Sequence, residues 1–264
     1  MKQLLCFISL LTLFSCHYAG ITEQLQSSRW IDLTHDFEPN TVYWPTDEPY
    51  RHDTVFYGTT EKGYFYSSFK FSAEEHGGTH FDAPVHFAQG HKFIHEVPVE
   101  QMHGPGVIVD VTKQSAENLD YRVTVKDLEN WEKQYGKIPD GAIILLNTGF
   151  GKYWDDHLKY TGTIKKGKEG IAELHFPGLD PVAADWLVEN RKINAVGLDT
   201  PSIDFGQSKD FQTHRNLCAA GLTMYENVAN LDQLPAKGTY IVALPMKIKG
   251  GSGAPLRIIA IIGK

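Results

Sequence analysis

The segment His76-Gly-Gly-Thr-His80-Phe-Asp82-Ala-Pro-Val-His86 places three histidines and one aspartate within eleven residues. It is the densest part of a wider enrichment, because six of the chain's twelve histidines lie between His76 and His103. Neutral imidazole and ionised carboxylate together suit a borderline-hard divalent cation. The segment therefore predicts a site for metal-assisted chemistry.

The spacing within this segment indicates how its side chains converge. The two glycines that follow His76 favour a tight loop over a regular helix. His80 and Asp82 are two residues apart, so they share one face of an extended segment. Pro84 prevents further ladder pairing, after which His86 can turn back towards the same cavity. His76, His80 and Asp82 could thus supply three metal ligands and leave positions open for water and substrate, as a catalytic site requires.

The composition is typical of a soluble globular protein with an acidic balance of charge. Of the 264 residues, 42% are hydrophobic and 22% are charged, and the formal net charge is −7. This length suffices for one large domain or two small ones, and no repeat or Pro/Gly/Ser-rich linker divides the chain. The negative charge and the lack of a basic stripe argue against nucleic acid or an anionic membrane surface as a partner.

The N-terminal residues are typical of an export signal. After a short basic start, the apolar run Leu4–Phe14 is too short to span a bilayer comfortably but fits the hydrophobic region of a signal peptide. We therefore expect residues 1–19 to be a signal peptide, residues 20–264 to form a single domain, and the protein to be exported, periplasmic or secreted. Leu13-Phe-Ser-Cys16 resembles a lipoprotein cleavage site, so a lipid anchor at Cys16 stays open beside free secretion. The alternative to export is a buried N-terminal helix or strand.

The hydrophobic pattern predicts an α/β fold that is rich in strands and has few helices. Strands are expected at 30–33, 65–71, 107–111, 142–146, 195–198, 222–228, 240–244 and 256–262. The strand at 65–71 should be half-buried, because its aromatic residues alternate with small or polar ones. One helix should begin at Thr124, with Asp127 completing its cap, and another at Asp180-Pro181, running to about Asn190.

The 76–86 segment resembles the signature of the cyclase family of metal-dependent hydrolases, which includes bacterial kynurenine formamidase and isatin hydrolase. Four further features agree with that family: Asp32-Leu-Thr-His35, Trp44-Pro45, Gly197-Leu-Asp-Thr-Pro-Ser202 and the spacing of His214 and Glu226. The resemblance covers nearly the whole chain after the leader. It implies a swivelling β/β/α fold of mixed β-sheets with flanking helices, and a homodimer or homotetramer.

The resemblance also implies roles for individual residues. It assigns the primary metal site to His76, His80 and Asp82, and the catalytic acid–base to His86. His214 and Glu226 would hold a second ion that shares Asp82, although Glu226 could instead be a hydrogen-bond partner or a second acid–base group. The expected cofactor is Zn²⁺ or Mn²⁺, as one or two ions, and the motif does not choose between them.

The resemblance implies hydrolysis of an amide or lactam C–N bond, with an arylformamide or an isatin-like compound as substrate, and the residue types are consistent with that reaction. A bound divalent cation activates water and polarises the carbonyl, and His86 could carry the proton, because imidazole titrates near working pH. The lack of a G-x-S-x-G elbow argues against a serine nucleophile. Two alternatives stay open. One is a non-catalytic metal- or ligand-binding protein of the same fold, and the other is a non-haem iron oxygenase using His80, Asp82 and His214.

Substrate recognition is less well defined by the sequence. A small aromatic amide or lactam is the expected partner, and four aromatic residues could line its pocket or equally fill the core: Trp44, Phe65, Tyr66 and Phe87. The insertion-like stretch from Gly149 to Phe176 could form a lid or an oligomer contact. Asp199 and Asp204 follow an apolar strand, where they could simply cap a turn.

Overall fold

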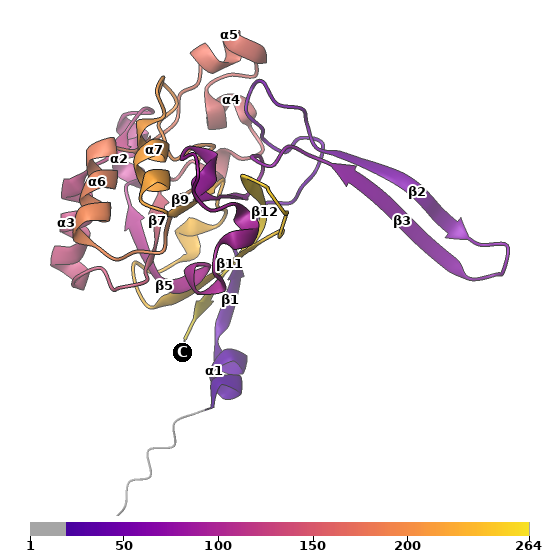
Figure 1. Ribbon diagram of the computed structural model, residues 1–264, viewed down its shortest axis with the longest axis horizontal. Helices are drawn as coiled ribbons and strands as arrows, with labels where there is room; N and C mark the ends of the chain where they lie inside the picture. Colours follow the sequence, from indigo (N-terminus) through magenta and orange to yellow (C-terminus); the bar gives the residue numbers. More distant parts are fainter. Residues whose placement is uncertain (1–19, 264) are drawn as a thin grey trace, which may run out of the picture.

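The computed structural model describes residues 20–263 as a mixed α/β fold (Figure 1). The strands of the main sheet are β1 (Arg29–Asp32), β4 (His80–Asp82), β5 (His103–Asp110), β7 (Ile143–Asn147), β9 (Ala195–Leu198), β10 (Thr223–Glu226), β11 (Thr239–Pro245) and β12 (Gly253–Ile262). Two separate pairs are β2 (Arg51–Thr59) with β3 (Phe65–Ser72), and β6 (Arg122–Val123) with β8 (Gly178–Leu179). The α-helices are α1 (Ile21–Ser27), α2 (Thr112–Glu117), α3 (Val125–Tyr135), α4 (His157–Thr161), α5 (Gly167–Ala172), α6 (Pro181–Asn190) and α7 (Gln212–Ala219). Short 3₁₀ turns are η1 (Pro84–His86), η2 (Ile94–Glu96), η3 (Val99–Gln101), η4 (Gly151–Tyr153) and η5 (Leu231–Gln233).

The main sheet closes on itself. Its strands pair in the order β1-β12-β11-β5-β7-β9-β10-β4, and β4 also pairs with β12. The long strand β12 makes this possible, because its first residues pair with β4 and its last ones with β1. The short strand β4, from the histidine-rich segment, therefore lies between β10 and β12, held on both sides by backbone hydrogen bonds.

The sheet separates two apolar cores because its central strands are apolar on both faces. Along β7, Ile144 and Leu146 belong to a core shared with the helices α3, α6 and α7. The alternate residues Ile143 and Leu145 belong to a second core, formed largely by strands of the closed sheet. Alternate side chains of a strand point to opposite faces, so short runs of apolar residues fill both layers. The predicted α/β fold with flanking helices is confirmed.

Several predicted elements are confirmed at their bounds. The strand expected at 195–198 is β9, and α6 ends at Asn190 as predicted, with Asp180 as its N-cap. Thr124 caps α3 in a reciprocal arrangement with Asp127. By contrast, α7 is a helix that the sequence did not indicate. It starts after Phe211, a residue with φ of 51° and no side-chain capping bond, so the usual start signals are missing.

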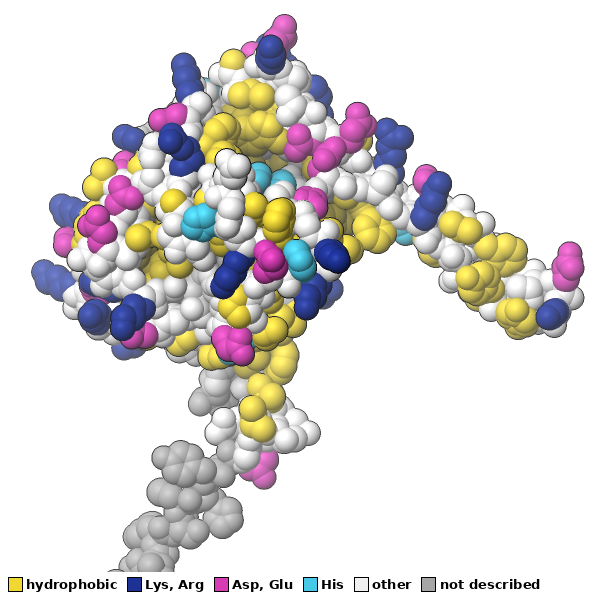
Figure 2. All heavy atoms as spheres, viewed as in Figure 1, with side chains coloured by type: hydrophobic (Ala, Val, Ile, Leu, Met, Phe, Trp, Pro, Cys, Tyr) yellow, Lys and Arg dark blue, Asp and Glu magenta, His cyan; other side chains and the backbone are white. Residues whose placement is uncertain are grey.

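The strands β2 and β3 form a hairpin, here called the arm, that projects from the body (Figures 1 and 2). The strand predicted at 65–71 is present in it, but the prediction that this strand is half-buried is wrong. Phe65 is 60% exposed and Phe71 is 55% exposed. The alternation of aromatic and polar residues is real, yet no other element of the described chain covers the aromatic face.

The stretch from Gly149 to Phe176 folds onto the body and carries η4, α4 and α5. Its aromatic side chains Phe150, Trp154, Tyr160 and Phe176 are buried in a third apolar cluster. This packing gives the stretch its own small core. A lid or oligomer contact formed by its outer surface stays a prediction.

The expected leader, residues 1–19 with Cys16, lies outside the described residues. Within residues 20–263, none of the helices combines the length and apolar character needed to cross a bilayer.

His35 predicts a measurable pH dependence of stability. Its ring stacks on that of Trp154 with 3.9 Å between centroids, and its buried Nε2 atom has no hydrogen-bond partner among the described residues. Burial, opposed by Asp155 and Asp36, lowers the pKa of His35 to about 4. The unfolded chain therefore binds a proton at His35 more tightly than the folded protein does. Neutral, buried His35 contributes fully to the free energy of unfolding above about pH 6.5, and this contribution is lost as the pH falls towards 4.

We expect His35→Phe to keep the stack but to remove this contribution. Urea unfolding near pH 7 and near pH 5 should show that the free energy of unfolding falls less in the variant, by about 2 kcal/mol. If the free energy of unfolding fell equally in the parent protein and in His35→Phe, burial would not lower the pKa of His35 in the folded state.

Candidate functional site

The pairing of β4 with β10 brings together three side chains from distant parts of the sequence. His80 lies directly opposite Glu226 in the antiparallel register. Asp82, two residues further along β4, points to the same side as His80. The resulting distances are 3.2 Å from His80 Nε2 to Glu226 Oε2 and 3.3 Å from His80 Nε2 to Asp82 Oδ1. The predicted extended conformation of this segment is confirmed.

His214 joins this group from α7. Its Nε2 atom lies 3.1 Å from Glu226 Oε1 and 3.4 Å from Asp82 Oδ2. Its Nδ1–H donates to Asp204 Oδ2 at 2.7 Å, and the same carboxylate accepts the backbone N–H groups of Thr213 and His214. Asp204 therefore both caps the start of α7 and orients the imidazole. The turn-capping role considered from the sequence is only part of its function in the structure.

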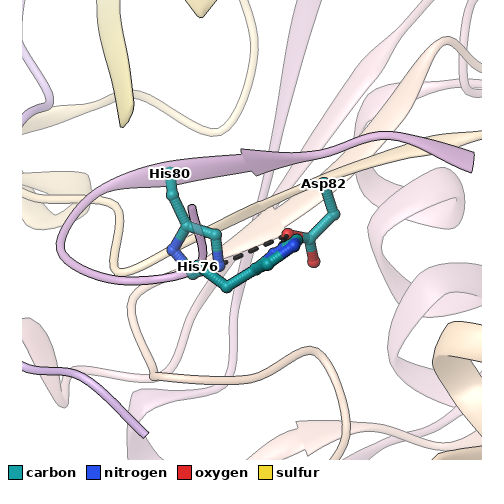
Figure 3. A group of neighbouring side chains, drawn as sticks. All are labelled: His76, His80 and Asp82. Atoms are coloured by element: carbon teal, nitrogen blue, oxygen red, sulfur yellow. Dashed lines mark hydrogen bonds and ion pairs between the residues drawn. The ribbon is translucent and has the colours of Figure 1, made fainter. Parts of the chain in front are cut away.

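His76 and His86 complete the cluster. His76 Nδ1 lies 2.7 Å from Asp82 Oδ1, and Figure 3 shows its side chain converging with those of His80 and Asp82. His86, at the end of η1, stacks on the His76 ring with 3.7 Å between ring centroids. The structure thus brings together all six residues that the sequence singled out for the site.

The loop between His76 and His80 requires glycine. Gly78 has φ of 59°, and a Cβ atom there would lie 2.7 Å from the Phe37 ring. Its carbonyl oxygen accepts from His80 Nδ1–H (2.9 Å) and from Asn227 Nδ2 (2.6 Å). With Nδ1–H directed at this carbonyl, Nε2 is the His80 nitrogen that faces the carboxylates. Asn227 was not indicated by the sequence, because its partner is a backbone carbonyl far along the chain.

The charges of the cluster are strongly coupled. Burial acts against ionisation, but the neighbouring carboxylates outweigh it and raise the pKa of His80 to about 10 and that of His214 well above its usual range. Burial likewise opposes ionisation of Asp82 and Glu226, but the histidines hold the pKa of each carboxyl below its usual value. Carboxylates that stay ionised while buried favour a cation among them, and a divalent metal would take the place of the protons.

The donor set fits a divalent cation. Two groups have possible ligand atoms within 4.8 Å of one another, one formed by His76, His80 and Asp82 and the other by Asp82, His86 and His214. Asp82 belongs to both groups and is fully buried, and within residues 20–263 its Oδ2 atom has no well-formed hydrogen bond, with His214 Nε2 3.4 Å away. A buried carboxylate oxygen is costly when unsatisfied, so a cation bound beside it would remove that cost. Imidazole and carboxylate ligands suit zinc or manganese.

His86 differs from the other histidines of the cluster. Burial, which outweighs the attraction of Asp82, lowers its pKa to about 4. It is therefore a neutral imidazole at neutral pH, with a nitrogen available to accept a proton. A general base must be unprotonated, so His86 meets that requirement, while burial moves its pKa away from the neutral range in which proton transfer is most efficient.

An apolar cavity of about 320 Å³ opens onto this cluster. Its walls include Trp44, Phe87 and Phe211 together with His76, His80, His86, His214 and Glu226. Phe211 lies 5.4 Å from Phe87 and 6.0 Å from Trp44, measured between ring centroids. Trp44 and Phe87 thus line the pocket, as one of the two sequence interpretations held. Phe65 and Tyr66 neither line the pocket nor fill the core, because both are exposed on the arm.

Comparison with known proteins identifies relatives that match most of this chain. The cyclase family model matches residues 31–205. An isatin hydrolase of Roseibium aggregatum is 32% identical over 198 residues, which cover 72% of this chain and 73% of that protein. A kynurenine formamidase of Bacillus cereus is 29% identical, with coverage of 89% and 98%. The structure of isatin hydrolase A from Labrenzia aggregata, bound to benzyl benzoate, superposes with a TM-score of 0.82 at 32% identity and covers 93% of this chain and 97% of its own.

Proposed function

This chain belongs to the cyclase family and is an amidohydrolase acting on C–N bonds other than peptide bonds, and we propose that it hydrolyses an aromatic amide or lactam with the help of a bound metal. One observation carries the proposal. Asp82 is shared by two groups of histidines, and those histidines line an aromatic cavity. Cluster and cavity together would place a carbonyl substrate against a cation.

The metal would be held by His76, His80, Asp82, His214 and Glu226. Zn²⁺ and Mn²⁺ both suit these ligands, as one ion or as two that share Asp82. When bound, such a cation lowers the pKa of water and polarises a carbonyl oxygen. The chain's own contribution is to hold the ligands in fixed tautomers, through Gly78 O for His80 and Asp204 for His214.

His86 would move the proton. Its ring lies against His76 at the cavity wall and is neutral at neutral pH, so it can accept a proton from water and then donate it to the leaving nitrogen. Glu226 stays a ligand candidate in this proposal, with a second acid–base role as its alternative. Its Oε1 atom already accepts the backbone N–H of Ile203 at 2.6 Å.

The aromatic walls favour a substrate with a ring next to the scissile bond. The names of two relatives, an isatin hydrolase and a kynurenine formamidase, suggest the candidate substrates. These are an isatin-type lactam and an arylformamide such as N-formylkynurenine. The test is hydrolysis of both compounds beside an aliphatic formamide, with kcat/KM as the readout. We expect turnover of at least one aromatic compound and much slower turnover of the aliphatic one. Equal rates for aromatic and aliphatic formamides would contradict the proposed role of the cavity.

No specific observation favours the other two functions considered from the sequence. The relatives are named as hydrolases, which does not fit a purely binding role. A two-histidine, one-carboxylate iron site would leave His76 and His86 without a function, although both lie in the cluster.

We also propose that residues 20–264 act as a single hydrolase domain, exported as a periplasmic, secreted or Cys16-anchored protein. The apolar run Leu4–Phe14 supports this proposal. No structural feature within residues 20–263 bears on it.

We propose further that the protein is a homo-oligomer, at least a dimer, in which the arm packs on a second copy. Ring contacts run along one face of the arm through His52, Phe69, Tyr57 and Phe65. On this face Tyr57, Phe65, Phe69 and Phe71 are between 43% and 69% exposed. At roughly 200 Å² for each ring, these four side chains offer roughly 450 Å² per copy. Two copies joined through this face would bury roughly 900 Å² from these rings alone, more than most crystal contacts bury in total.

A double variant of the arm provides the test. Phe65→Ser with Phe69→Ser removes two rings from the aromatic face, and we expect it to elute as a monomer by size-exclusion chromatography with light scattering. Lys70→Ser, on the opposite face of β3, is the matched control and should keep the mass of the oligomer. A monomeric parent protein, or an unchanged mass in the double variant, would show that the arm does not join copies.

A further inference from the structure

Glu75, Ser252 and His76 form a hydrogen-bonded chain behind the candidate metal site. The Ser252 hydroxyl donates to Glu75 Oε2 at 2.8 Å, and His76 Nε2 lies 2.8 Å from the same hydroxyl oxygen. A serine hydroxyl has one proton, and here that proton is directed at Glu75 Oε2. Because that proton goes to Glu75, the hydroxyl oxygen must accept a hydrogen bond from His76 Nε2–H.

Glu75 is itself fixed in place. The same Oε2 atom accepts the backbone N–H of Ser252 at 2.8 Å and that of Gly253 at 3.3 Å. Backbone N–H groups can only donate, so this oxygen is an acceptor, and three donors on it hold the carboxyl group in place. The direction of the hydrogen bond between Ser252 and His76 is therefore set by the surrounding backbone.

The His76 ring also has little freedom to turn over. It stacks on His86 with 3.7 Å between centroids, and the backbone of Gly253 passes close to its edge. A Cβ atom at Gly253 would lie 2.4 Å from His76 Cε1 and 2.9 Å from Nδ1. Only glycine allows the chain to pass so close, so the turn and the ring fix each other's position.

These contacts give His76 the opposite tautomer to its neighbours. His80 and His214 donate from Nδ1 to Gly78 O and to Asp204, and their Nε2 atoms face the carboxylates. His76 donates from Nε2 to the Ser252 hydroxyl, and its Nδ1 lies 2.7 Å from Asp82 Oδ1, where a bound cation would take the place of the Nδ1 proton. We propose that Glu75 and Ser252 are positioning residues that hold His76 in the Nε2–H tautomer, so that it binds the metal through Nδ1 while His80 and His214 bind through Nε2. This inference rests on the proposed metal centre.

Nitrogen NMR of the Zn²⁺-loaded protein tests the assignment directly. Imidazole ¹⁵N shifts distinguish a protonated from a metal-bound nitrogen, so His76 should show Nε2–H with Nδ1 bound, and His80 and His214 the reverse. Zinc bound with His76 coordinating through Nε2 would overturn the inference and leave the proposed function intact. Failure to bind zinc at all would overturn the metal centre, and the inference with it.

Variants of Ser252 test the positioning role by a second route. Ser252→Ala leaves Nε2–H without its acceptor, and we expect the affinity for Zn²⁺, measured by competition with a chelator, to fall roughly 10- to 100-fold. Ser252→Thr keeps the hydroxyl and should recover most of that loss, and Ser27→Ala, on an exposed helix, should have no effect. Parental zinc affinity and an unchanged His76 ¹⁵N pattern in Ser252→Ala would contradict the role of this chain of hydrogen bonds.

Discussion

Asp82→Asn is expected to abolish both metal binding and hydrolysis. Asp82 is fully buried and lies within 3.4 Å of nitrogens from His76, His80 and His214, so it is the one group that all of them share. The amide has nearly the same shape but carries no charge to attract the cation. A metal contributes several kcal/mol to the stabilisation of the transition state, and each 1.36 kcal/mol is a tenfold change in rate. We therefore expect kcat/KM to fall roughly 1,000-fold or more.

The measurement combines kcat/KM with metal content by mass spectrometry on the purified variant. Asp232→Asn, an exposed site on η5, is the matched control and should keep both values. Circular dichroism distinguishes a specific loss from unfolding. A folded Asp82→Asn protein with parental metal content and activity would contradict the account of the centre.

His86→Phe is expected to remove activity while leaving the metal in place. Phenylalanine keeps a ring that can stack on His76, but it has no nitrogen to carry a proton. General acid–base catalysis contributes roughly 10²- to 10⁴-fold, and kcat should fall within that range. Because a bound cation is assigned to other residues, the metal content should match that of the parent protein.

This variant also separates the two roles that the geometry allows for His86. Its nitrogen lies close enough to Asp82 and His214 to be a ligand. Loss of one metal ion per chain in His86→Phe would identify it as a ligand instead of a proton carrier. Unchanged kcat would exclude both its proton role and any need for the ring nitrogen.

The part of the site that is local in the sequence could be predicted from spacing alone. His76, His80, Asp82 and His86 lie within one short segment, and the period of a strand, the glycines and Pro84 together fix how they converge. His214 and Glu226 came only from the resemblance to a family. The pairing of β10 with β4, which places Glu226 opposite His80, depends on contacts between distant segments that no local pattern contains.

The residues that orient the ligands were harder to find for the same reason. Asp204, Asn227, Glu75 and Ser252 each act through a few hydrogen bonds whose partners are set by the folded backbone. The arm shows a second limit of prediction from sequence, in which the element is predicted but its surroundings are not. The alternation in Phe65–Phe71 predicts a strand, but it does not state what covers that strand, and no element of residues 20–263 does. The closure of the sheet through β4 and β12 was likewise not readable, because β4 has only three residues.

The most direct test of the central claim is hydrolysis of isatin and N-formylkynurenine by protein that has been stripped of metal and then reloaded with Zn²⁺ or Mn²⁺. The account predicts that stripping removes turnover of at least one compound and that stoichiometric reloading restores it. Turnover that persists in fully stripped protein would contradict metal-assisted hydrolysis at the His76–His80–Asp82 centre.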